Sequence, residues 1–380
     1  MDGLLPADGF DLEEILAGLE RWVDISSPTV DAGGVNRMMD EAQRAMEEIG
    51  ATTERRSGKD GYGDSVMARM PWGDGRPGIL VLCHLDTVHA PGTFERDLDF
   101  RREDDRAYGP GILDMKGGTF LAYYALRQIV RSHATAALPL SFLFVPDEEV
   151  GTPSTRDLIE SHARRERLVL VPEPAQEGAD VIIGRWAFQR FIVRARGKPA
   201  HAGATLAAGR SAIREIAEQI VDIESMSNAE RNLTLSTGIV SGGTFVNVVP
   251  ATCEAEVLVV TEDPDDFEEI GARMRALRPK NGGIELEVET GPYRPLFTPN
   301  AGTLELFEQA RSLAREIGFD LEPGIVGGGS DGNFTGALGN PTLDGLGPCG
   351  AGFHTEEEHV LLDSLIPRAR LLSGLMLTLT

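Results

Sequence analysis

Three short apolar runs, each followed closely by histidine or acidic residues, most strongly constrain the fold of this chain. The runs and the residues after them are Ile79–Leu82 with His84 and Asp86, Leu140–Val145 with Glu148 and Glu149, and Leu168–Val171 with Glu173. Continuous apolar runs of this length are typical of strands that are buried on both faces. Stretches with helical spacing of apolar residues lie between these runs, near 119–131 and 154–164. The pattern predicts a mixed sheet flanked by helices. Ligands bind at the carboxyl ends of such strands, so the sequence predicts an active site at this edge.

The pattern changes from about residue 181. The expected elements are, in order, a strand at 186–196, a helix at 211–223, strands at 233–240 and 252–260, a helix after Pro264 and a strand at 284–289. This βαββαβ order is the ferredoxin-like arrangement. We therefore expect an α/β catalytic domain in two parts, 1–180 and 292–380, with an inserted α+β domain at 181–291.

Composition excludes several classes of partner. The net charge of −24 disfavours nucleic acid and anionic membrane surfaces. No apolar run approaches the ~20 residues that cross a bilayer, and Met1–Phe10 lacks the pattern of a signal peptide. The three cysteines are far apart in the sequence, which favours a reducing, cytoplasmic location.

The residues at the strand ends suit a zinc site, because zinc prefers imidazole and carboxylate ligands. His84 and Asp86 are two apart in extended backbone, so Asp86 can reach the imidazole ring from behind and orient it. The side chains of adjacent Glu148 and Glu149 diverge, so one can bind metal while the other activates water. Asp114 lies in a glycine-rich stretch just before a helix, where a carboxylate can bridge two metals.

Together these motifs resemble the M20 family of metallopeptidases and deacylases, and within it the glutamate carboxypeptidases. The matching stretches run in the family's order along nearly the whole chain: 84–88, 109–118, 147–151, 172–174, 197–203, 247–250, 327–331 and 352–354.

The resemblance implies a role for each of these residues. Two Zn²⁺ ions per chain would be bridged by Asp114, with Co²⁺ or Mn²⁺ able to substitute, and the Asp114–Met115 peptide would be cis. His84 and Glu173 would complete one zinc site and Glu149 and His354 the other. His354 is preferred to His359 because of the preceding Gly352 and Phe353. The general base would be Glu148, with Asp86 orienting His84.

The resemblance also implies a zinc-peptidase-like fold whose inserted domain forms a homodimer. His201 would reach the active site of the partner subunit and polarise the scissile carbonyl. Asn247 would bind substrate from the partner in the same way.

The substrate is expected to be a small peptide or an N-acyl amino acid with a free carboxylate beside the cleaved amide, since Glu173 occupies the position that is mostly Glu in the family's carboxypeptidases and deacylases. Arg294 matches the family's carboxylate-binding arginine, and Gly328 and Gly329 are further candidates for substrate binding. Leu258 aligns with a second arginine of the glutamate carboxypeptidases. Its loss leaves room for an apolar, aromatic or amide side chain.

The predicted function is therefore a zinc-dependent metallocarboxypeptidase or amidohydrolase. The alternatives are a deacylase of the acetylornithine or succinyl-diaminopimelate type, a hydrolase of an aromatic amino-acid conjugate, and an inactive metal-binding homologue.

Overall fold

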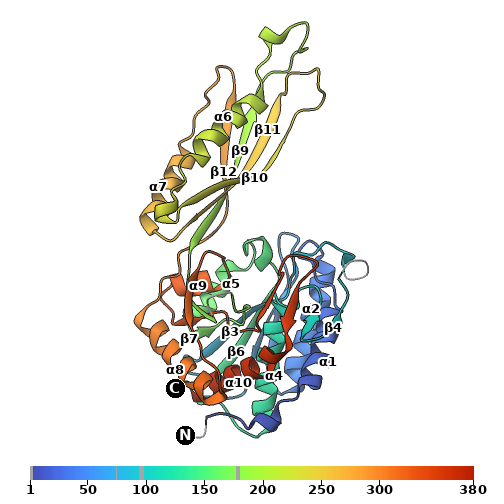
Figure 1. Cartoon of the computed structure of the whole chain (residues 1–380), viewed down its shortest axis with the longest axis vertical. Coiled ribbons are helices and arrows are strands. Elements are labelled where there is room, and N and C mark those ends of the chain that lie inside the picture. Colours follow the sequence, from blue (N-terminus) through green and yellow to red (C-terminus); the bar gives the residue numbers. More distant parts are fainter. Residues whose placement is uncertain (1–2, 74, 94–97, 177–179) are drawn as a thin grey trace. The chain divides into compact units, whose positions relative to one another are not determined.

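The computed structural model of the chain describes residues 3–73, 75–93, 98–176 and 180–380. These residues form two compact units (Figure 1). Unit 1 comprises Met1–Arg185, Phe297–Val326 and Ser330–Thr380, and unit 2 comprises Trp186–Leu296 and Gly327–Gly329. No helix among the described residues is both long and apolar enough to cross a membrane.

Unit 1 is built on a six-stranded mixed sheet. Its strands, in spatial order, are β1 (Thr52–Arg56), β2 (Ser65–Arg69), β6 (Leu140–Val145), β3 (Ile79–His84), β7 (Leu168–Leu170) and β14 (Thr342–Leu343). β3 runs parallel to β6 and β7, whereas β2 is antiparallel to β6 and β1. Every residue of β3, β6 and β7 is buried, as continuous apolar runs require.

Helices cover both faces of this sheet. They are α1 (Leu12–Val23), α2 (Ala32–Glu48), α4 (Lys116–Arg131), α5 (Arg156–Ala163), α8 (Ala301–Ile317), α9 (Gly332–Ala337) and α10 (Leu362–Thr378). Val81 faces the larger core, which α1, α2, α4, α8 and α10 share. The preceding Leu80 faces the smaller core with Ile159 of α5 and Phe334 of α9. The alternation along β3 thus gives each face of the sheet its own core, and the predicted sheet flanked by helices is confirmed.

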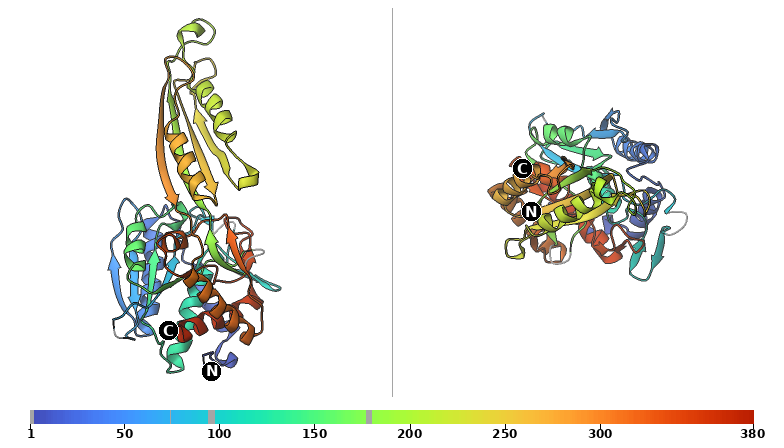
Figure 2. Two further views of the ribbon diagram at one scale, coloured as in Figure 1. Left: turned by 90° about the vertical axis from the view of Figure 1, so that its left-hand side faces the viewer. Right: turned by 90° about the horizontal axis from the view of Figure 1, so that it is seen from above.

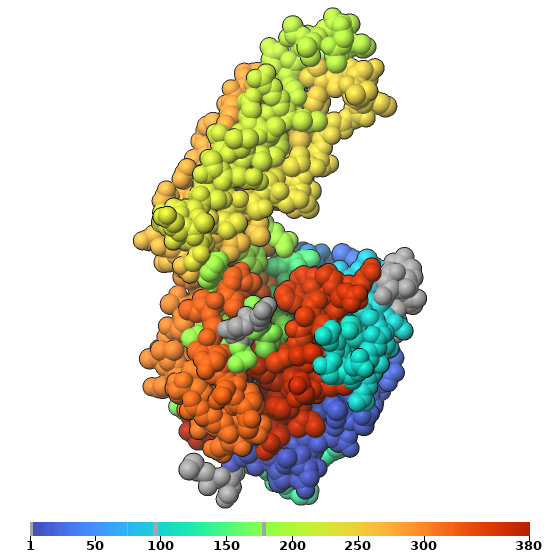
Figure 3. All heavy atoms as spheres, viewed as in Figure 1, coloured from blue at the N-terminus to red at the C-terminus, as the bar shows by residue number. Residues whose placement is uncertain are grey.

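Distant parts of the sequence meet in unit 1. The orange and red C-terminal segments lie beside the blue N-terminal segment on its surface (Figure 3). The first and last described segments of the chain lie on unit 1 (Figure 2), where Gly3–Leu5 and Leu377–Thr378 line one groove. Two smaller sheets complete the unit: β15 (Gly350–Ala351), β16 (His359–Leu361), β5 (Arg106–Tyr108) and β4 (Arg101–Glu103) in one, and β13 (Pro323–Val326) with β8 (Val181–Arg185) in the other.

Unit 2 has the predicted ferredoxin-like order. Its elements are β9 (Ala187–Arg196), α6 (Ala212–Glu224), β10 (Thr234–Gly242), β11 (Thr252–Thr261), α7 (Pro264–Arg275) and β12 (Glu285–Arg294). The sheet order is β10-β11-β9-β12 and all pairs are antiparallel. Phe191, Val193 and Val257 form a core with Ile216 of α6 and Met274 of α7. Both helices therefore cover one face, and we call the opposite one the helix-free face.

Unit 2 begins at Trp186 and its main segment ends at Leu296, five residues after the expected boundaries of 181 and 291. At the first boundary, β8 pairs in parallel with β13 inside unit 1. At the second, Phe297 forms a bridge with Arg185 of β8 and so also belongs to unit 1.

Candidate metal centre

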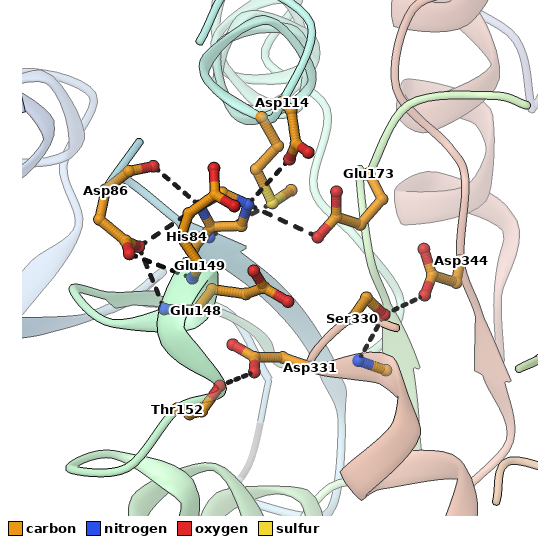
Figure 4. A network of polar contacts seen from close by, with 12 residues as sticks. His84, Asp86, Asp114, Glu148, Glu149, Thr152, Glu173, Ser330, Asp331 and Asp344 are labelled. Atoms are coloured by element: carbon orange, nitrogen blue, oxygen red, sulfur yellow. Dashed lines mark hydrogen bonds and ion pairs between the residues drawn. The ribbon is translucent and has the colours of Figure 1, made fainter. Parts of the chain in front are cut away.

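The carboxyl ends of three central strands deliver the candidate side chains to one place. His84 is the last residue of β3, Glu148 and Glu149 begin the short 3₁₀ helix Glu148–Val150 after β6, and Glu173 follows β7. Parallel strands end at the same edge of a sheet, so these side chains gather there (Figure 4).

Asp114 and His354 join this group from two loops. The Asp114–Met115 peptide is cis, as expected, and α4 begins directly after it. The Asp114 Oδ1 atom lies 3.1 Å from His84 Nε2, which is also 3.6 Å from Glu173 Oε1. The other oxygen, Oδ2, lies 3.2 Å from His354 Nε2, which is 3.2 Å from Glu149 Oε2. Each oxygen of Asp114 thus faces its own histidine–glutamate pair.

The structure places the alternative histidine elsewhere. His359 is in β16, where its ring lies 5.1 Å from that of Tyr108 and its Nδ1 atom contacts the Glu357 carbonyl at 2.8 Å.

Asp86 contacts both His84 and the two glutamates. Its Oδ1 atom lies 3.4 Å from His84 Nδ1 and accepts the Glu148 N–H at 3.2 Å. Its Oδ2 atom accepts the Glu149 N–H at 3.2 Å and the Thr29 hydroxyl at 2.8 Å. One fully buried carboxylate therefore orients the imidazole and fixes the backbone that carries both glutamates.

The electrostatics of the group are those of crowded carboxylates. Burial, together with the negative charge of Asp114, raises the pKa of Glu149 to about 8 and that of Glu173 well above its usual value. Hydrogen bonds to Asp114 and Glu149 raise the pKa of His354 to about 10. Burial lowers the pKa of His84, but contacts with Asp114 and Asp86 outweigh it and the pKa rises. These directions follow from several carboxylates and two imidazoles packed together in a buried site.

Two further observations indicate that these residues can bind a metal ion. The ligand atoms of His84, Asp114 and Glu149, one from each residue, lie within 4.8 Å of one another. Glu149 Oε1 is buried and has no hydrogen-bond partner in the described part of the chain. A buried carboxylate oxygen without a partner is costly, and a cation would satisfy it. The donor set of imidazole and carboxylate is the one that zinc prefers.

Glu358 is a positioning residue that sequence reasoning missed. This fully buried carboxylate accepts the backbone N–H groups of Gly111, Leu113 and Asp114 at 3.0, 2.8 and 3.0 Å. It therefore fixes the loop that presents Asp114. The sequence does not distinguish it, because it is the last of three consecutive glutamates and the structure shows the other two, Glu356 and Glu357, exposed.

His201 and Asn247 lie side by side in unit 2. The Ala202 N–H donates to the Asn247 carbonyl at 2.9 Å, and His201 forms a bridge with Val248. The exposed His201 ring accepts the N–H groups of Gly203 and Ala204 at Nδ1, at 3.2 and 3.1 Å. When neutral, the ring then carries its proton on Nε2, so it can donate a hydrogen bond to a carbonyl oxygen.

Arg294 and Gly329 are in contact in unit 2. Arg294 is 1% exposed, and its guanidinium carbon lies 5.8 Å from the centre of the Phe188 ring. A Cβ atom on Gly329 would lie 2.3 Å from Phe188 Cε1 and 2.8 Å from Arg294 Cδ, so only glycine fits there. The neighbouring Gly328 belongs to the same unit, and Leu258 is 39% exposed on β11.

Several known proteins are similar to this chain in sequence or in fold. Carboxypeptidase G2 of Pseudomonas sp. (strain RS-16) is 29% identical over 365 residues, which cover 93% of this chain and 86% of that protein. Succinyl-diaminopimelate desuccinylase of Novosphingobium aromaticivorans is 27% identical over 374 residues, covering 93% and 95%. The M20 family metallo-carboxypeptidase Sso-CP2 from Sulfolobus solfataricus has the same fold, with a TM-score of 0.75 at 14% identity over 97% and 99% of the two chains. The model of peptidase family M20/M25/M40 matches residues 80–378, so the chain belongs to this family.

Proposed function

We propose that the chain is a zinc-dependent hydrolase that cleaves the amide bond of a peptide or N-acyl amino acid beside a free carboxylate. Membership of a peptidase family makes it a hydrolase, and the similarity to carboxypeptidase G2 supports the position of the cut. The strongest support for two metals is Asp114, each of whose oxygens faces a separate histidine–glutamate pair.

His84, Glu173 and Asp114 would hold one zinc, and Glu149, His354 and Asp114 the other. Bound zinc supplies a Lewis acid that polarises the scissile carbonyl and acidifies water. Glu148 accepts the proton of the attacking water and donates it to the departing amine nitrogen. Asp86 keeps Glu148 in place, because its carboxylate accepts a hydrogen bond from the Glu148 backbone N–H.

A biosynthetic deacylase is the second candidate, because the similarity to succinyl-diaminopimelate desuccinylase covers nearly the whole of both chains. It uses the same chemistry and differs in the acyl group removed. The free thiols of Cys83, Cys253 and Cys349 fit our expectation that the enzyme works in the reducing cytoplasm.

A release assay tests the position of the cut. We expect the zinc-loaded enzyme to free amino acids from dipeptides and N-acyl amino acids. The matching C-terminal amides should react at least about tenfold more slowly, because they lack the negative charge that an arginine binds. Chelation should abolish release and zinc should restore it. Amides cleaved as fast as acids would contradict the proposal.

We also propose that unit 2 forms a homodimer. β10 is an edge strand, and exposed apolar side chains lie on it and on the loop that follows: Ile239, Val240, Phe245 and Val246. Exposed apolar side chains on an edge strand are typical of a surface that pairs with another chain. Asn247 follows directly, which brings a candidate substrate-binding residue to the same surface.

Mixing two inactive variants tests the action of His201 across this dimer. His201→Ala and Glu148→Gln should each be nearly inactive. Subunit exchange should recover about one quarter of wild-type activity, since half of the dimers become mixed and each mixed dimer has one complete site. Retained zinc in His201→Ala is the control. No recovery despite exchange would show that His201 does not act on the partner.

A further inference from the structure

His89, in the loop after β3, contacts two hydrogen-bond acceptors through one ring nitrogen. Its Nε2 atom lies 3.2 Å from Glu358 Oε2 and 3.3 Å from the Thr355 carbonyl oxygen. The His89 side chain is 8% exposed, and that of Glu358 is fully buried. A carbonyl oxygen can only accept a hydrogen bond, so the Nε2 atom must carry a proton. His89 therefore donates its N–H between these two acceptors.

The other ring nitrogen of His89 has no use in the fold. Burial lowers the pKa of His89, so the ring is neutral at pH 7 and carries only the Nε2 proton. The Nδ1 atom is then an acceptor, and it is buried without a hydrogen-bond partner in the described part of the chain. A buried acceptor without a donor destabilises a fold. Packing alone would thus favour an apolar side chain here, and the histidine needs another explanation.

The first acceptor, Glu358, does not depend on His89 for its place. Three backbone N–H groups of the loop that presents Asp114 donate to it. Its Oε2 atom keeps the N–H of Gly111, at 3.0 Å, when the His89 donor is removed. The position of Asp114 should therefore survive the loss of His89.

The second acceptor belongs to the turn that carries His354, which spans Gly352 to Glu358. The Thr355 N–H donates to the Gly352 carbonyl at 3.0 Å, and the Glu358 N–H reaches the Thr355 carbonyl at 3.4 Å. His354 itself has a positive φ of 66° and a side chain that is 47% exposed. A positive φ costs a residue other than glycine free energy, so the surrounding contacts must hold it. The N–H of His89 is one such contact.

We propose that His89 is a positioning residue of the metal centre, which holds the His354 turn through its Nε2–H and thereby strengthens binding of the zinc that His354 and Glu149 would hold. The inference rests on the zinc sites of the proposed function. Residues that orient a metal ligand typically strengthen metal binding about 10- to 100-fold. Because Glu358 keeps its other donors, the zinc held by His84 and Glu173 should not be affected.

Chelator competition on the full chain measures the two zinc affinities. In His89→Leu, the Kd of the zinc at Glu149 and His354 should rise about 10- to 100-fold, and the other Kd should stay unchanged. Glu149→Gln, which lacks one proposed ligand of the affected site, identifies the Kd that belongs to the other site. His89→Gln should restore most of the lost affinity, because the glutamine amide again presents N–H donors.

His162→Leu is the matched control, because it makes the same change at another buried histidine, on α5. It should keep both zinc affinities at the wild-type values. An unchanged Kd in His89→Leu, or equal weakening of both sites, overturns the role of His89 and leaves the hydrolase intact.

Amide hydrogen exchange of the metal-free protein gives a readout that needs no zinc. The N–H groups of residues 352–358 should exchange faster in His89→Leu than in wild type, because a contact that holds their turn is gone. Those of residues 111–114 should exchange at the wild-type rate, and His89→Gln should match wild type in both segments. Unchanged exchange at 352–358 in His89→Leu contradicts the proposal. A wild type that binds no zinc contradicts the proposed function, and the exchange rates then still show whether His89 holds this turn.

Discussion

Replacing Glu148 by glutamine is expected to lower kcat by at least about 10²- to 10⁴-fold, the usual contribution of a general acid–base. Glutamine has nearly the same shape but cannot accept the proton of the attacking water. The backbone N–H of residue 148 still donates to Asp86, so the local structure should persist. Because our proposed metal ligands do not include Glu148, zinc content should stay at the wild-type value.

The measurements are kcat on the best substrate and zinc content by mass spectrometry of the same samples. Glu357→Gln is the matched control: it is the same chemical change on an exposed residue three positions from His354. Its activity should stay within about twofold of wild type, as for most surface substitutions. Unchanged turnover in Glu148→Gln would show that another group moves the proton.

The side chains at the sheet edge were predictable because the sequence encodes them locally. Apolar runs mark β3, β6 and β7, and their carboxyl ends must share an edge once the strands are parallel. The two-residue spacing of His84 and Asp86 likewise predicts the contact that the structure has at 3.4 Å.

Other features depend on contacts between distant segments, which no local pattern encodes. Glu358 accepts hydrogen bonds from backbone N–H groups some 245 positions earlier in the chain. Nothing in a run of three glutamates indicates which one is buried. The assignment of β8 to unit 1 similarly depends on its pairing with β13.

Asp114→Asn is expected to have the largest effect on metal binding. The two Asp114 oxygens face different histidines, 3.1 and 3.2 Å away. Asparagine offers one oxygen, no negative charge and an N–H₂ group, so it cannot join two cations. Loss of a residue that only hydrogen-bonds to a metal ligand weakens metal binding about 10- to 100-fold. Loss of a ligand that both metals share should weaken binding more. We expect zinc content to fall from two per chain towards zero, with turnover below detection.

Glu149→Gln provides a comparison, because Glu149 is a proposed ligand of one zinc site, whereas Asp114 is shared by both. It removes the carboxylate that lies 3.2 Å from His354, so it should lose about one zinc and keep the zinc held by His84 and Glu173. Thermal unfolding gives a second measurement, because zinc at one hundred times its Kd stabilises the folded state by about 2.7 kcal/mol. Wild type and Glu149→Gln should both melt at higher temperature when zinc is added, and Asp114→Asn should not. Two tightly bound zinc ions in Asp114→Asn would show that this carboxylate does not join the two sites.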